Sequence, residues 1–219
     1  MFGRIWKNLL LIMAVPVLLA GCGVNDIPTK DEIVKAKWAD VQNQYQRRND
    51  LVPNLVATVQ GFANQEKSVL IDVIKARASA TQVKVDASTI TDPEKFKQFQ
   101  AAQDQLSGVL GRLLAITENY PDLKSNQNFL ALQSQLEGTE NRIAIARSDY
   151  NEAARDYNTT LRTFPTVLWA KTLYSSSQPA QPFTASAGAD VAPKVSFPGA
   201  TTPAPAPGSA PGSAPAPAQ

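Results

Sequence analysis

Acidic side chains are the groups in this sequence that could most readily move protons. Glu137 and Glu140 lie one helical turn apart, with Glu118 and Asp122 close by in the chain. Two carboxylates can act as general acid and base. The chain has no histidine and a single cysteine, however, which excludes a histidine triad, a Glu-x-x-His metal motif and a multi-cysteine metal site. We expect these acids to be solvated or ion-paired, and we expect no catalytic residue, metal or cofactor.

A second polar pattern is the tripeptide Asp-Tyr-Asn, which occurs twice at a spacing of seven residues. That spacing places Tyr150 and Tyr157 on one helical face, with Asn151 and Asn158 beside them. Buried tyrosine hydroxyls need hydrogen-bond partners, and asparagines beside a helix seam can select one packing register through bonds to a second helix. We interpret the repeat as such a register device. A ligand groove lined by tyrosine, asparagine and arginine is the alternative.

Long helices are the elements that would position these residues. Apolar residues at alternating steps of three and four over residues 129–164 predict one such helix. A similar stripe over residues 34–76 keeps its phase across Pro53, so we expect one long helix that is kinked at the proline. Arg48 lies on this stripe. We expect its side chain to snorkel or to meet a carboxylate on a facing helix.

The remaining helical segments would pack against these two. Asp92-Pro93 is typical of a helix start and Tyr120-Pro121 of a helix end. The apolar segment over residues 166–174 is expected to fold back on the helices, and contact with a membrane interface through Trp169 and Tyr174 is the alternative. The predicted fold class is therefore all-α, an elongated antiparallel bundle of long helices.

The amino terminus has the order of a bacterial secretory signal. Two basic residues precede a wholly apolar run over residues 9–20, and Gly21-Cys22 follows. The run is shorter than the roughly 20 residues of a comfortable transmembrane helix. Its ending is similar to the lipobox of bacterial lipoproteins, which implies cleavage after Gly21 and acylation of Cys22 with fatty acids such as palmitate. A short retained membrane helix is the alternative, and either form anchors the chain to a membrane.

A lipidated Cys22 would place the protein in the bacterial cell envelope. Gly23, which follows the cysteine, is similar to the pattern that is sorted to the outer membrane in a Gram-negative cell. We expect the bundle to lie outside the cytoplasm, on the periplasmic face of the outer membrane if the cell is Gram-negative. A single-pass protein of the inner membrane is the alternative.

The net charge bears on the class of partner. Of the 21 Lys and Arg residues, two lie in the targeting segment, which leaves 19 against 19 Asp and Glu residues. A near-neutral chain has no broad basic surface for a phosphate backbone. We therefore expect no nucleic-acid partner.

The carboxyl-terminal segment differs in composition from the rest. Residues 175–219 are rich in proline, alanine, glycine and serine and hold only two charged residues, which is typical of a disordered segment. A solubilising spacer is the expected role, and binding of a proline-reading partner is the alternative. The expected organisation is a lipoprotein-type signal peptide at 1–21, a tether at 22–28, the helical bundle at 29–174 and the disordered tail at 175–219.

Three stretches carry a resemblance to a known family. They are YQRRNDLVPNLVATVQGFA at 45–63, ENYPDLKSNQNFLALQSQLEGTENRIAIARSDYNEAARDYN at 118–158 and FPTVLWA at 164–170. Together they resemble the LemA family over nearly all of residues 31–174. The resemblance implies a bacterial membrane-anchored protein with an antiparallel helical bundle and no established enzymatic activity. Many members look anchored by an uncleaved helix, unlike this chain, and the proline-rich tail is not part of the family core.

These observations favour a membrane-anchored, non-enzymatic envelope protein that acts as a scaffold or adaptor through its helical faces, with another envelope protein as partner. The alternative is a module that binds an envelope peptide or a wall fragment. Its groove would be lined by Arg48, Tyr150, Asn151, Tyr157 and Asn158.

Overall fold

The computed structural model describes residues 23–185 except 64, 84–85 and 87. The targeting segment with Cys22, and the part of the expected tail beyond residue 185, lie outside the described residues. The chain divides into two units, residues 1–184 and 185–219, and the description below concerns the first.

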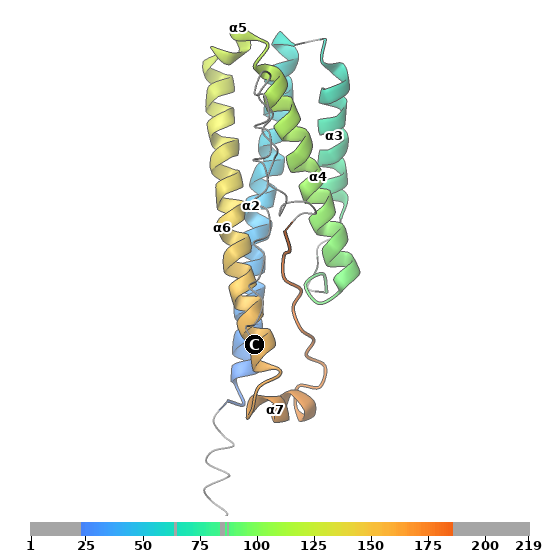
Figure 1. The fold of residues 1–219 in the computed structure, drawn as a ribbon, viewed down its shortest axis with the longest axis vertical. Helices are drawn as coiled ribbons and strands as arrows, with labels where there is room; N and C mark the ends of the chain where they lie inside the picture. The colour runs from blue at the N-terminus through green and yellow to red at the C-terminus, as the bar shows by residue number, and fades with distance from the viewer. Residues whose placement is uncertain (1–22, 64, 84–85, 87, 186–219) are drawn as a thin grey trace, which may run out of the picture. The chain divides into compact units, whose positions relative to one another are not determined.

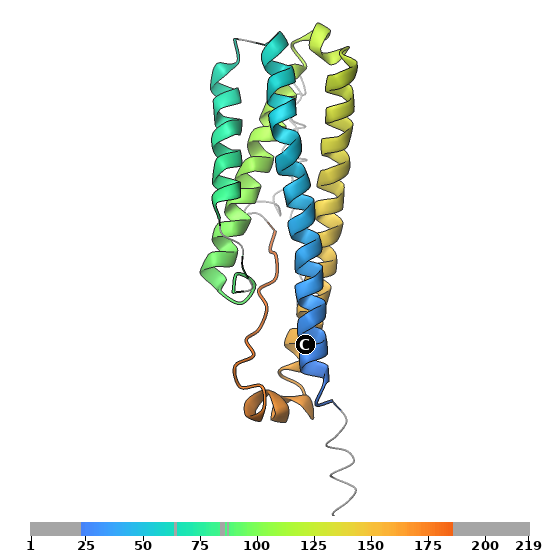
Figure 2. The same ribbon diagram turned by 180° about the vertical axis from the view of Figure 1, so that it is seen from behind.

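The described residues contain helices and no strands. The helices are α2 (Asp26–Phe62), α3 (Lys67–Gln82), α4 (Pro93–Thr117), α5 (Pro121–Lys124), α6 (Gln127–Thr160) and α7 (Thr166–Thr172). α2 packs along α6 and α3 along α4, and the four long helices alternate in direction along the chain (Figure 1 and Figure 2). The prediction of an all-α antiparallel bundle is confirmed. No helix in the described ranges is long and apolar enough to cross a membrane.

The first long helix is continuous through Pro53, as the phase of its apolar stripe predicts. Proline removes one helical hydrogen bond, and the buried apolar residues on either side of it hold the helix against the core. α2 ends at Phe62, however, and α3 runs back in the opposite direction from Lys67. The prediction of a single helix over residues 34–76 is therefore wrong.

The apolar stripe could not reveal this reversal, because α2 and α3 face the same core. In α3 the buried residues Leu70, Val73 and Ala76 again follow steps of three and four. The turn itself is closed by a hydrogen bond from the backbone N–H of Glu66 to the carbonyl of Ala63. A periodic pattern reports which residues are buried, and it does not report whose helix lies opposite.

The bundle begins earlier than expected. α2 starts at Asp26, inside the expected tether, and Ile27 is 1% exposed. Gly23 has a φ of +102°, which favours glycine, and a Cβ atom there would lie 3.0 Å from Cγ2 of Thr166. The chain therefore enters the bundle beside α7, directly after Cys22.

Local capping explains the ends of the other long helices. Asp92 caps α4 by accepting hydrogen bonds from two backbone N–H groups of its first turn. α6 ends at Thr160 rather than at residue 164, and the Thr160 carbonyl accepts a hydrogen bond from the hydroxyl of Thr166. α7 then folds back on the bundle, as predicted, with Trp169 and Tyr174 against the core.

The core has two parts. The first is rich in aromatic residues and the second is aliphatic, with Arg48 of α2 between Tyr45 of the first and Val52 of the second. Prominent members of the aromatic part are Trp38, Tyr45, Phe96, Phe99, Tyr150, Tyr157 and Phe183. Prominent members of the aliphatic part are Val52, Leu55, Leu70, Leu106, Leu113, Leu123 and Leu136.

An extended segment over residues 178–184, named the strap here, returns from α7 along the bundle (Figure 1). Ala180 and Phe183 of the strap are 2% and 7% exposed. The prediction that residues 175–219 are disordered is therefore wrong for this segment. The physical reason is that α4 and α6 offer hydrogen-bond partners that composition does not reveal.

Candidate functional site

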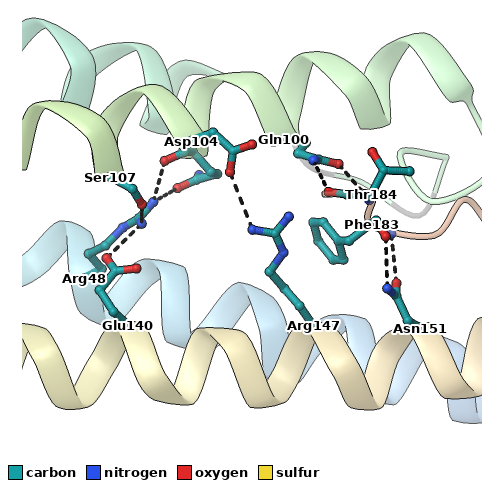
Figure 3. A network of polar contacts seen from close by, with 10 residues as sticks. Arg48, Gln100, Asp104, Ser107, Glu140, Arg147, Asn151, Phe183 and Thr184 are labelled. Carbon is teal, nitrogen blue, oxygen red and sulfur yellow. Dashed lines mark hydrogen bonds and ion pairs between the residues drawn. The ribbon is translucent and has the colours of Figure 1, made fainter. Parts of the chain in front are cut away.

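Two asparagines of the repeated tripeptide hold the main chain of the strap. Asn151 donates from Nδ2 to the carbonyl of Phe183 over 3.0 Å and accepts from its N–H over 2.8 Å. Asn158 makes the same pair of bonds to Ala180, both of 2.8 Å. Each side-chain amide thus takes the place of a neighbouring strand, because a hydrogen-bonded pair in an antiparallel sheet exchanges the same two bonds. Figure 3 shows the pair at Asn151.

The seven-residue repeat matches the strap in length. Seven residues of helix advance about 10.5 Å, and three residues of extended chain advance about 10 Å. Asn151 and Asn158 can therefore meet Phe183 and Ala180 at the same time. Since the earlier asparagine pairs with the later strap residue, the strap runs antiparallel to α6.

Further partners lie on both sides of the strap. Tyr150 donates to the carbonyl of Gln181 over 2.9 Å. Gln100 of α4 donates to the carbonyl of Thr184 over 2.8 Å (Figure 3). The N–H of Gln181 reaches the carbonyl of Ile90 over 2.7 Å.

The prolines of the strap stand where no donor is used. Pro179 and Pro182 alternate with residues whose N–H groups bind the helices, and both prolines are exposed. Proline has no N–H and restricts φ to values that suit extended chain. The proline-rich composition, which indicated disorder, is therefore compatible with an ordered strap and lowers its ordering entropy.

Phe183 anchors the strap in the aromatic part of the core. Its ring centroid lies 4.8 Å from that of Phe96, 5.5 Å from that of Tyr150 and 6.0 Å from that of Trp38. The guanidinium carbon of Arg147 lies 4.5 Å from the ring centroid (Figure 3). Aromatic pairs and cation–π contacts of this kind each add about 0.5–1.5 kcal/mol to the gain from burial.

Burial keeps the tyrosines of the repeat in their neutral, donating form. It raises the pKa of Tyr150 above its ordinary value. Burial also raises the pKa of Tyr157, and a hydrogen bond with the Ser177 side chain acts weakly in the opposite direction. A neutral hydroxyl can donate, which is what the bond from Tyr150 to the strap requires.

Arg48 and its partners form a separate cluster, named the ionic centre here, away from the repeat. Its side chain is 1% exposed and donates to Glu140 of α6 over 3.0 Å and to Ser107 of α4 over 2.5 Å (Figure 3). It also reaches Gln103 through both the carbonyl and the side-chain oxygen. The expectation that Arg48 meets a carboxylate on a facing helix is confirmed. A buried charge that is held by hydrogen bonds to two other helices favours one axial register.

The structure divides the predicted site residues into two groups. Tyr150, Asn151 and Asn158 bind the strap, and Tyr157 bonds to Ser177 just before it. Arg48 belongs to the ionic centre instead. The prediction that the asparagines bond to a second helix is wrong, because their partners are main-chain atoms of the strap. The sequence reasoning missed Gln100, Gln103, Ala180 and Phe183.

Two of the carboxylates considered for proton chemistry form contacts with other side chains of the bundle. Glu140 pairs with Arg48, and Glu137 is exposed and accepts a hydrogen bond from Gln133. Within the described ranges, no group of three or more Cys, Asp or Glu residues is arranged to hold a metal ion.

Comparisons with known proteins decide the family. The sequence model of the LemA family matches residues 37–197, which is more than half of the chain. The protein belongs to the LemA family. Because this match continues past residue 174, the LemA region includes the strap, and the expectation that the tail lies wholly outside the family core is wrong for residues 175–197.

Individual relatives are more distant. The chain is 27% identical over 157 residues to magnetosome protein MamQ 2 of Paramagnetospirillum magneticum, covering 64% of this chain and 58% of the relative. It is 26% identical over 124 residues to protein LemA of Metamycoplasma hominis, covering 57% and 52%. The chain thus spans between half and three-fifths of the length of these relatives. Neither name states an enzymatic activity.

The ionic centre leads to a first prediction. Glu140→Ala removes the charge partner of the buried Arg48, so we expect a loss of about 2–3 kcal/mol in the free energy of unfolding. The matched control is Glu137→Ala, one turn away and exposed, which should change it by about 0.5 kcal/mol or less. Urea unfolding followed by circular dichroism measures both. Equal losses in the two variants would show that the pair does not stabilise the bundle.

Proposed function

We propose that this LemA protein is a lipid-anchored protein of the bacterial cell envelope that serves as a non-enzymatic adaptor, binding other envelope proteins outside the cytoplasm. The end of its bundle that carries α7 would face the membrane. Three features support the proposal, and they concern the anchor, the surface next to it and the use of the polar residues.

The single observation that carries the proposal is an apolar surface beside the lipidation motif. Phe164, Leu168 and Leu173, in and next to α7, are 80%, 53% and 64% exposed. α7 lies at the same end of the bundle as the start of α2 (Figure 1 and Figure 2), and Gly23 lies against Thr166. Acyl chains on Cys22 would therefore start beside these apolar side chains.

Such an arrangement suits a membrane surface. One acyl chain gives only marginal binding, and a second contact makes the anchoring stable. Exposed apolar side chains at the lipid boundary, together with the exposed cations Arg162 and Lys171, would supply that contact to anionic headgroups.

The internal use of the polar residues favours binding over catalysis. Arg48, Tyr150, Asn151 and Asn158 all contact other parts of the same chain. These contacts support a stable bundle and an ordered strap. The LemA and MamQ relatives carry no named enzymatic activity, in keeping with an adaptor.

The anchor is tested by the intact mass of the protein extracted from membranes of a bacterial host. We expect the mass of residues 22–219 plus acyl chains, and we expect Cys22→Ser to abolish both the cleavage and the acylation. A full-length, unmodified mass for the unchanged protein would contradict lipidation and favour a retained membrane helix.

The membrane-facing end is tested by fluorescence quenching with brominated lipids. After cleavage, Trp38→Phe leaves Trp169 of α7 as the fluorophore, and Trp169→Phe leaves Trp38, which is 4% exposed in the core. In vesicles brominated near the headgroup we expect strong quenching of the first variant and weak quenching of its control. Equal quenching of both would contradict a membrane contact at α7.

A further inference from the structure

The strap is bound in the way that a separate peptide would be bound. Eight hydrogen bonds join it to α4, α6 and the segment before α4, and every one of them uses a main-chain atom of the strap. Recognition of an extended segment through its main chain, with pockets for a few side chains, is a recurring mode of peptide binding.

Two side chains supply the sequence preference. Ala180 is 2% and Phe183 is 7% exposed, whereas Gln178, Pro179, Pro182 and Thr184 are exposed. A segment bound in the same way would therefore need a small residue followed three positions later by phenylalanine. A proline would fit only where no N–H is needed.

Release of the strap would leave the helices intact. The strap contributes no turn to any helix, and the connector from α7 is exposed at Ser175 and Ser176. A segment that is joined to the helices only by its own hydrogen bonds and two buried side chains can open locally without unfolding the bundle. The hydrogen-bonding side chains of the groove would stay in place after release, because Asn151 and Asn158 lie on α6 and Gln100 lies on α4.

We propose that the groove between α4 and α6 is a peptide-binding site for a segment of another protein, and that the strap occupies it as an internal ligand. The partner segment is extended, runs antiparallel to α6 and carries a small residue with a phenylalanine three positions later. The inference rests on the proposed adaptor function and names the chemistry of its partner. The tethered strap competes at an effective concentration in the millimolar range, so the partner binds by exchange.

The test uses the full-length chain in detergent micelles and a fluorescent peptide of strap sequence, SQPAQPFTA. The variant Phe183→Ala removes the anchor of the internal strap, so it should bind the peptide at least about tenfold more tightly than the unchanged chain does, because competition is weaker. Fluorescence anisotropy measures both affinities. A folded Phe183→Ala protein that does not bind the peptide would overturn the proposal.

Matched controls identify the groove as the binding site. The peptide SQPAQPATA, which lacks the phenylalanine, should not bind. Phe183→Ala combined with Asn151→Ala and Asn158→Ala should lose binding, whereas the same background with Asn141→Ala should keep it, since Asn141 is an exposed residue of α6. Binding that survives loss of both groove asparagines would place the peptide elsewhere and contradict the assignment.

A second measurement covers the case in which Phe183→Ala does not fold. A peptide with benzoylphenylalanine in place of phenylalanine is photolysed with the unchanged chain, and we expect cross-links near Phe96 and Tyr150. Cross-links confined to other surfaces would overturn the proposal. A chain that dimerises by exchanging straps and excludes added peptide would assign the groove to a second copy and would also overturn it.

These outcomes are independent of the membrane anchor. Peptide binding in micelles does not need Cys22, and the intact mass does not need the groove. If the peptide does not bind, the lipid anchor is not contradicted. If the protein is not lipidated, the peptide-binding site is not contradicted.

Discussion

Two side-chain amides of α6 satisfy the main chain of a segment that has no strand beside it. Buried backbone groups need hydrogen-bond partners, and the backbone of a helix interior has none to spare. Asn151 and Asn158 provide them as donor and acceptor together, at a spacing that matches three residues of extended chain. This match allows Phe183 to complete the aromatic part of the core.

The two parts of the core have different roles in this account. Arg48 marks their boundary and ties α2 to α4 and α6 through Glu140, Ser107 and Gln103. The aliphatic part beyond it is formed mainly by helical residues, while the aromatic part includes Phe183 of the strap. Release of the strap would therefore expose the aromatic part of the core. This part lies in the half of the bundle that is next to α7 and to the proposed membrane anchor.

Periodicity predicted the parts of the fold that depend on local rules. It identified the long helices, the continuity through Pro53 and the buried position of Arg48, because a three-four stripe reports burial directly. It could not locate the reversal between α2 and α3, since both helices present the same pattern to one core. It also failed at the strap, where Pro179 and Pro182 indicate disorder until the partners on α4 and α6 are known. Of the site, the repeat could be found from its spacing, while Gln100 and Phe183 could not, because their partners are distant in sequence.

Amide hydrogen exchange of Ala180 and Phe183 in the full-length chain measures directly whether the strap is bound. We expect both amides to be strongly protected. Asn158→Ala should remove protection chiefly at Ala180, and Asn151→Ala chiefly at Phe183. Ala185, an exposed residue just after the strap, serves as the reference. Exchange of Ala180 and Phe183 at the rate of Ala185 in the unchanged protein would contradict the bound strap and, with it, the groove.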